Sequence, residues 1–225
     1  MRRKLGDSVR RQIDALDIQR DKPLIICDVD EVVVHFIKSL EAHLDENGCW
    51  LDTSSFALNG NIRLKETNEP VPGQIVGDLL YGCFSARTHI MDMIDGAAEA
   101  LLDLGETTEI VMLTNMPHDY LEQRVENLRG HGIPYPVVAN DGAKGPAVEA
   151  LLEGLSHDAI FIDDSATNIT SVADWCPQTH LIHFIPDHRF ARHVPPVDGV
   201  ALRTDNWQDA KSFIDGVITL TNSDD

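Results

Sequence analysis

The sequence predicts an α/β protein whose core is a doubly wound parallel sheet, and two observations support this. Short apolar runs alternate with segments of helical periodicity along the second half of the chain, and strands that alternate with helices in this way form parallel sheets. The first apolar run, Leu24–Cys27, has no polar residue to place on a solvent face. Such a run is typical of a strand that is buried on both sides.

Length, charge and cysteine content limit the class of protein. The chain has 225 residues, enough for one large domain or for a domain with an insertion. Its formal net charge of −19 disfavours nucleic acid and anionic membranes as partners. No run approaches membrane-spanning length, and the four cysteines show no CxxC spacing. We therefore expect a cytoplasmic protein with reduced thiols; the oligomeric state is not indicated.

The segment after the first strand is too long for a simple strand–helix crossover. Apolar residues recur at helical spacing in Val32–Asn47 and again in Gln74–Ile94, whereas Trp50–Pro72 is irregular. We therefore predict a small, mostly helical insertion over residues 33–93 that lies above the sheet.

Residues 1–32 and 94–225 are predicted to form the α/β core. The first residues, Met1–Asp21, fit either a short amphipathic helix or a partly ordered arm. After the insertion, helices and strands alternate. The predicted helices are Ala97–Leu104, His118–Arg129, Gly145–Leu155, Asn168–Ala173 and Trp207–Ile218, and the predicted strands are Ile110–Leu113, Pro136–Ala139, Ala159–Ile162, Leu181–Ile185 and Gly199–Leu202.

Polar residues gather at the carboxyl ends of the predicted strands, where ligands of open α/β sheets bind. Each of them alone has a structural explanation, as a helix cap, a solvated turn or a surface lysine. Together they favour a functional site at this edge of the sheet. They are Asp28 and Asp30 after the first strand, Thr114 and Asn115 at the end of the second, Lys144 before a helix, and Asp163 and Asp164 after a later strand.

These groups, in this order, resemble the four motifs of the haloacid dehalogenase-like (HAD) superfamily. The resemblance extends from about Pro23 to Phe184 and implies the α/β core of that superfamily. It also implies a helical cap between the first two motifs, where residues 33–93 lie. The matching motifs are Asp28-Val29-Asp30, Leu113-Thr114-Asn115, Lys144, and Phe161-Ile162-Asp163-Asp164 followed by Ser165 and Asn168.

The resemblance implies a phosphohydrolase that cleaves a small phosphate monoester. Asp28 would be the nucleophile that forms an aspartyl-phosphate, and Asp30 would protonate the leaving alkoxide and then deprotonate the attacking water. Thr114 and Asn115 would bind the phosphoryl oxygens. Lys144 would neutralise charge on Asp28 and on the phosphoryl group.

Mg²⁺ is the implied cofactor because it prefers oxygen ligands. Its ligands would be the Asp28 carboxylate, the backbone carbonyl of Asp30 and the Asp164 carboxylate, since Asp164 precedes Ser165 as in the family pattern. Asp163 is a second candidate. It would either be a further metal ligand, bound directly or through a water molecule, or orient the other groups of the site.

The second aspartate favours a phosphatase within this superfamily. Haloacid dehalogenases lack an acid at the position of Asp30, phosphonatases also depart from Asp there, and transport ATPases have Thr. Two alternatives stay open: a phosphotransferase that uses the same intermediate, and a non-catalytic binding or regulatory protein on the same fold. The sequence departs from the common DxDGT motif at Glu31 and Val32. The four histidines of His180–His193 match no metal-site spacing.

Overall fold

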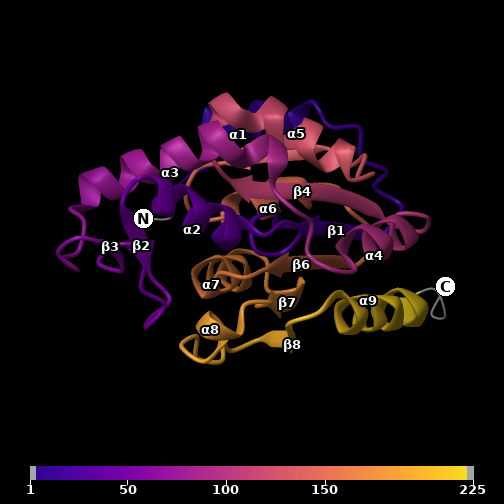
Figure 1. The fold of residues 1–225 in the computed structure, drawn as a ribbon. Helices are drawn as coiled ribbons and strands as arrows, with labels where there is room; N and C mark the ends of the chain where they lie inside the picture. The colour runs from indigo at the N-terminus through magenta and orange to yellow at the C-terminus, as the bar shows by residue number, and fades with distance from the viewer. Residues whose placement is uncertain (1–3, 222–225) are drawn as a thin grey trace.

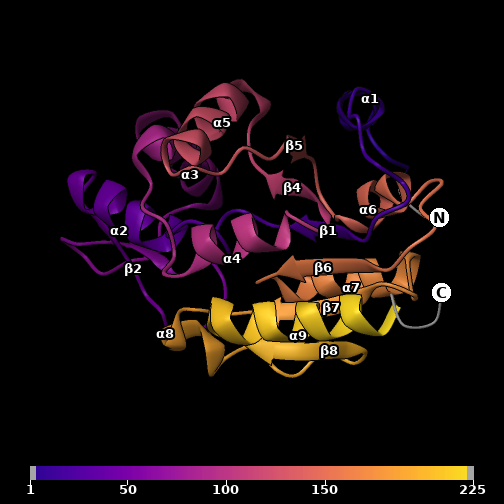
Figure 2. The ribbon, with the colours of Figure 1, turned by 90° about the vertical axis from the view of Figure 1, so that its right-hand side faces the viewer.

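The computed structural model describes residues 4–221, and its core is one parallel sheet. Six strands lie in the order β5-β4-β1-β6-β7-β8, and each pair of neighbours is parallel (Figures 1 and 2). The predicted doubly wound sheet is therefore confirmed. The strands are β1 (Leu24–Cys27), β4 (Glu109–Asn115), β5 (Val137–Asn140), β6 (Ala159–Asp163), β7 (His180–Phe184) and β8 (Val200–Thr204).

Helices cover both faces of the sheet because successive side chains of each strand point to opposite sides. In β1, Ile25 and Cys27 belong to one buried cluster, whereas Leu24 and Ile26 belong to the other. Figure 2 shows α4 and α9 in front of the strands. The first cluster includes side chains of α4 (Ala97–Leu104), α5 (Leu121–Gly130) and α9 (Trp207–Thr221), and the second includes those of α1 (Asp7–Asp14), α6 (Gly145–Leu151) and α7 (Ala166–Trp175).

The N-terminal segment forms a helix, α1, beside an edge strand of the sheet. Of the two alternatives predicted for this segment, a helix or a partly ordered arm, the structure shows the helix over Asp7–Asp14. The Gln12 side chain donates a hydrogen bond to the Ala139 carbonyl at 3.0 Å and accepts one from the Ala139 N–H at 2.9 Å. A neighbouring strand would use these same two backbone groups of the edge strand β5. Gln12 therefore satisfies these two backbone groups of the edge strand without a further strand.

The part of the chain from residue 33 to residue 93 lies beyond the carboxyl ends of the core strands (Figures 1 and 2). Its two ends are paired: the Ile94 N–H donates to the Val33 carbonyl at 2.8 Å, and the His35 N–H donates to the Asp92 carbonyl at 2.9 Å. β2 and β3 form an antiparallel hairpin inside the stretch that the sequence predicts to be irregular. The elements are α2 (Phe36–Glu46), β2 (Cys49–Leu51), β3 (Ile62–Leu64), α3 (Gly73–Arg87) and the 3₁₀ helix η1 (Thr88–Ile90).

Two further short helices lie near the carboxyl ends of the strands. The predicted helix after β4 begins as a 3₁₀ turn, η2 (His118–Tyr120), before α5. The helix α8 (His188–Ala191) follows β7, where no helix is predicted. Within the described part of the chain, no helix has the length and apolar character needed to cross a membrane.

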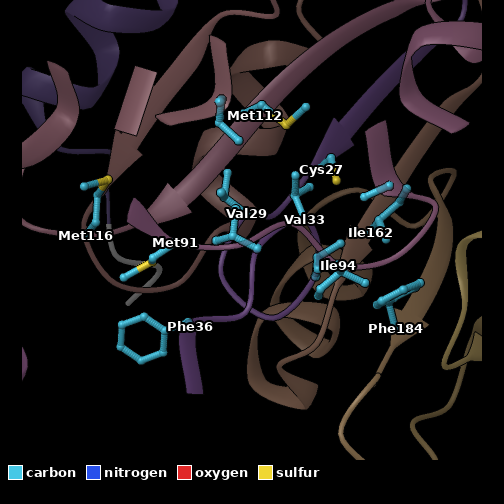
Figure 3. Close-up of a cluster of buried hydrophobic side chains, with 14 of the residues drawn as sticks. Cys27, Val29, Val33, Phe36, Met91, Ile94, Met112, Met116, Ile162 and Phe184 are labelled. Atoms are coloured by element: carbon cyan, nitrogen blue, oxygen red, sulfur yellow. The ribbon is translucent and has the colours of Figure 1, made fainter. Parts of the chain in front are cut away.

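Buried apolar side chains continue from the sheet into the segment beyond it. Val29 and Val33, in the turn after β1, lie in the middle of this cluster (Figure 3). Met112 and Ile162 of the sheet lie on one side of the turn, and Met91 extends the cluster on the other (Figure 3). This packing fixes the turn that carries Asp28 and Asp30.

Close packing of α6 on α7 gives a first prediction. A Cβ atom on Gly145 would lie 2.5 Å from the Ser171 carbonyl oxygen and 2.6 Å from Cδ1 of Trp175. We therefore expect Gly145→Ala to lower the free energy of unfolding by about 2 kcal/mol, measured by urea denaturation. Gly216→Ala is the control, because a Cβ there meets no atom within 4 Å and should stabilise α9 by about 1 kcal/mol. Equal stability of the two variants would contradict the packing described.

Candidate active site

A buried lysine joins three of the four predicted motifs. The Lys144 ammonium lies 2.7 Å from Oδ1 of Asp28 and 2.7 Å from Oδ2 of Asp163. β1 and β6 are parallel neighbours, so the carboxylates that follow them emerge side by side. Lys144 immediately precedes α6 and is completely buried. The structure therefore brings together residues that lie far apart in the sequence.

Burial and charge together set the protonation of this group. Burial raises the pKa of Asp28 to about 7; the carboxylates of Asp163 and Asp30 act in the same direction, and the Lys144 ammonium acts against them. Burial also opposes the charge on Lys144, but the carboxylates of Asp163 and Asp28 raise the pKa of its ammonium above the ordinary value. Lys144 is therefore held in its charged form.

Asp163 is occupied by protein contacts. Its carboxylate accepts hydrogen bonds from Lys144 at 2.7 Å, from the Ser165 N–H at 2.8 Å and from the Asn168 side-chain amide at 3.2 Å. Asp163 is also fully buried. Its carboxylate thus links Lys144 to the first turn of α7.

Asp164 is placed differently, because it lines a cavity at the edge of the sheet. Burial, together with the carboxylates of Asp163 and Asp28, raises the pKa of Asp164 well above its usual range. The buried His183 ring donates from Nε2 to the Asp164 carbonyl at 2.9 Å. His183 therefore holds the backbone at Asp164, a role that its spacing among the other histidines does not reveal.

The carboxylates form a set that suits a hard divalent cation. One oxygen atom from each of Asp28, Asp163 and Asp164 lies within 4.8 Å of the others. Lys144 supplies a single positive charge to these three groups, so a divalent ion would compensate the remaining repulsion. Ligands that are all oxygen atoms suit Mg²⁺ better than Zn²⁺. The residues present therefore fit the predicted cofactor.

Asp30 is held by side chains from two elements. Arg124 Nη2 of α5 lies 2.5 Å from Oδ1 of Asp30, and the Thr114 hydroxyl donates to Oδ2 at 3.3 Å. Arg124 is completely buried and is missed by the sequence analysis. One signal could have revealed it: Arg124 shares a helical face with Leu121 and Leu128, where an apolar residue is expected.

Thr114 and Asn115 have protein partners in this structure. Thr114 is completely buried beside Asp30. The Asn115 amide donates to the Gly142 carbonyl at 2.8 Å, and its oxygen accepts from the Asn140 amide at 2.8 Å. Asn115 lines the cavity together with Asp28. The phosphate-binding role of Thr114 and Asn115 stays a prediction.

Glu31 occupies the position of glycine in the common DxDGT motif, and its backbone shows why glycine suits that position. Its φ is 60°, in the left-handed region that glycine adopts without strain. The Glu31 carboxylate accepts a hydrogen bond from the Ile37 N–H at 2.6 Å, which ties the turn to α2. Burial raises the pKa of Glu31 to about 7.

The cavity has a volume of about 360 Å³, within the range of roughly 300–1,000 Å³ that is typical of small-molecule sites. Asp28, Asp30, Asn115 and Asp164 line it. The other lining residues come from residues 31–58, from the loop and helix that follow β7, and from the start of α7, where Ser165 and Asn168 lie. Both carboxylates of the first motif therefore open into the same cavity.

Neither the protein-family models nor the curated proteins include a match to this sequence, but solved structures share its fold. A HAD family hydrolase from Deinococcus radiodurans R1, with bound phosphate and sodium, aligns at 15% identity and a TM-score of 0.58 over 89% of this chain and 99% of that one. YfnB from Bacillus subtilis, assigned to the HAD hydrolases and bound to magnesium, aligns at 14% identity and a TM-score of 0.58. The alignment covers 87% of this chain and 99% of YfnB. A predicted phosphatase from Clostridium acetobutylicum aligns at 14% identity and a TM-score of 0.59. The alignment covers 87% of this chain and 99% of the phosphatase.

The protein therefore has the haloacid dehalogenase-like fold, and the resemblance inferred from its motifs is confirmed at the level of the fold. These likenesses do not by themselves assign a substrate or a reaction, because one fold supports several chemistries.

The buried lysine gives a second prediction. Replacing Lys144 with Met leaves the carboxylates of Asp28 and Asp163 buried without their cation, so we expect a loss of about 3–5 kcal/mol in the free energy of unfolding, measured by urea denaturation without added metal. Adding Asp163→Asn to this variant should restore part of the loss. Lys38→Met is the matched control, because Lys38 and its partner Asp92 are exposed and such pairs contribute about 0–1 kcal/mol. A loss at Lys144 no larger than at Lys38 would contradict the proposed charge balance.

Proposed function

We propose that the protein is a Mg²⁺-dependent phosphohydrolase that cleaves a small phosphate monoester through an aspartyl-phosphate on Asp28. One observation carries the proposal: Asp28 and Asp30 line the same cavity, and a buried lysine is paired with Asp28. A purely structural role for these groups does not require two carboxylates that open into one small-molecule cavity.

The contacts of Asp28 suit a nucleophile. The Lys144 ammonium at 2.7 Å and the Val29 N–H at 2.7 Å both bind Oδ1. Because these contacts hold Oδ1, Oδ2 is the oxygen that we propose attacks phosphorus. Lys144 also stabilises the negative charge that develops on the transferred phosphoryl group.

Asp30 is suited to acid–base work because both of its oxygens are oriented. Arg124 binds one oxygen and the Thr114 hydroxyl binds the other. In the first step, Asp30 in its acid form protonates the oxygen of the leaving alcohol. In the second step, the Asp30 carboxylate takes a proton from the water that hydrolyses the aspartyl-phosphate.

Mg²⁺, when bound, supplies positive charge that compensates the carboxylates and the substrate phosphate. The carboxylates of Asp28 and Asp164 and the backbone carbonyl of Asp30 would hold it. We place Asp163 second as a direct ligand, because its oxygens already accept hydrogen bonds from Lys144 and two other groups.

We further propose that residues 33–93 form a cap on a core made of residues 1–32 and 94–225. The hydrogen bonds that pair residues 33–35 with residues 92–94 support these limits, since the chain leaves and re-enters the core at one place. Thr114, Asn115 and Lys144 are proposed to bind the substrate phosphate, and a small phosphate ester is the proposed partner.

The nucleophile gives the third prediction. With Mg²⁺ and a panel of phosphate esters, wild-type protein should release inorganic phosphate, and Asp28→Asn should lower turnover by several orders of magnitude. Added alcohols test for transfer of the phosphoryl group to an acceptor other than water. Urea denaturation should show a folded variant, and mass spectrometry should exclude deamidation of the introduced asparagine back to aspartate. Substantial residual turnover under these conditions would refute the assignment of Asp28.

The metal site gives the fourth prediction. Asp164→Asn should raise the Mg²⁺ concentration needed for half-maximal activity by about tenfold or more, with partial rescue at high Mg²⁺. In the wild type, Mg²⁺ should also raise the melting temperature by binding the native state, and this rise should shrink in the variant. The exposed Asp198 provides the control variant Asp198→Asn. Full activity in EDTA, or the same Mg²⁺ dependence in Asp164→Asn and the control, would show that the metal site is misassigned.

A further inference from the structure

We infer that the cavity accepts a phosphate ligand whose organic group is apolar and uncharged, about the size of a phenyl ring. As a statement about substrate, this inference rests on the function proposed above. Away from the carboxylates the cavity wall is apolar. The residues that form this wall include Phe36, Phe56, Leu58, Ile185 and Phe190.

Two aromatic side chains join the hairpin segment to the core at this wall. The rings of Phe56, between β2 and β3, and Phe190, on α8, meet edge to face with centroids 5.7 Å apart and an interplanar angle of 88°. Phe190 is 5% exposed, whereas Phe56 is 40% exposed. Aromatic edges and faces arranged in this way bind apolar rings and chains, and both rings belong to the cavity wall.

The charges around the cavity exclude a second anionic group. Among the described residues that line it, none is Lys or Arg, whereas Glu31 and Asp187 are present. The neighbouring Arg189 is already paired, because it binds Asp187 at 2.7 Å and Glu41 at 2.6 Å. An additional phosphate or carboxylate on the ligand would therefore find no unpaired cation in this wall and would lie close to acidic side chains.

The same contacts disfavour a cationic organic group. The Asp187 carboxylate accepts hydrogen bonds from the Arg189 side chain and from its backbone N–H, and Glu31 accepts one from the Ile37 N–H. Because Arg189 already pairs with Asp187, an amine beside this carboxylate would exchange its water for a group that has little capacity left to bind it. Apolar contact is therefore the main interaction that the wall offers.

Binding of phosphonates tests the inference without requiring turnover. Four compounds share a two-carbon unit: 2-phenylethyl-, ethyl-, 2-aminoethyl- and 2-carboxyethylphosphonate. Their affinities are measured by calorimetry with Mg²⁺ present. We expect the phenylethyl compound to bind about 10- to 100-fold tighter than the ethyl compound, as burial of a ring predicts, and the carboxyethyl compound to bind weakest. If the phenylethyl compound does not bind, or if any of the other three binds as tightly as it does, the inference is overturned.

Two variants test whether the preference for the phenylethyl compound comes from the aromatic wall of the cavity. Phe56→Ala should reduce the preference for the phenylethyl compound by about fivefold or more, since it removes one of the two rings. Trp50→Ala is the control, because Trp50 is a similarly exposed aromatic residue of the same hairpin, 38% exposed, and is not among the residues named for the cavity. A preference that survives unchanged in Phe56→Ala would overturn the assignment of this wall.

The outcomes for binding and for turnover are separable. Hydrolysis of phosphate esters without a preference for apolar phosphonates would retain the phosphohydrolase proposal and reject the inference about the organic group. Preferential binding of the phenylethyl compound without hydrolysis of any ester would support the inference about the cavity and reject the proposed reaction.

Discussion

The buried ammonium of Lys144 between two carboxylates is the interaction on which the candidate site depends. A charge removed from water is costly unless oppositely charged groups and hydrogen bonds surround it. Lys144 therefore requires Asp28 and Asp163, and both carboxylates require Lys144, since all three are at least nine-tenths buried. This mutual requirement fixes the end of β1, the end of β6 and the start of α6 relative to one another.

The topology of the sheet explains why this group lies where a ligand can reach it. From β1 the chain crosses to β4 and β5 on one side of the sheet, and then to β6, β7 and β8 on the other. Such a reversal leaves a crevice beyond the carboxyl ends of the two central strands. Asp28 and Asp164 line the cavity at this crevice, and residues of the segment that follows β1 line it as well. The fold thus brings together carboxylates whose repulsion one lysine only partly compensates.

Long-range contacts add features that no local motif contains. The Arg124–Asp30 ion pair joins residues that are 94 positions apart, and the Phe56–Phe190 contact joins the hairpin segment to α8. Hydrophobic periodicity predicts that a helix will be present near Arg124, but it does not identify which side chain will face a catalytic group. The hairpin β2–β3 was missed for a similar reason: its strands have three residues each, too short to show an alternating pattern.

The sequence by itself determined the strand order along the chain, the parallel α/β class and the motif residues, because buried strands give continuous apolar runs and polar residues stand directly after them. It also placed Asp28, Lys144 and Asp163 in one site, through the resemblance of their motifs. Only the tertiary structure decided that Asp163 binds Lys144 while Asp164 faces the cavity, and that Thr114 contacts Asp30. The motif resemblance ranks Asp164 before Asp163 as a metal ligand, but it does not say which of them binds Lys144. Neighbouring residues at the end of a strand point to different sides, and their partners come from distant elements, so these contacts depend on packing that the sequence pattern does not encode.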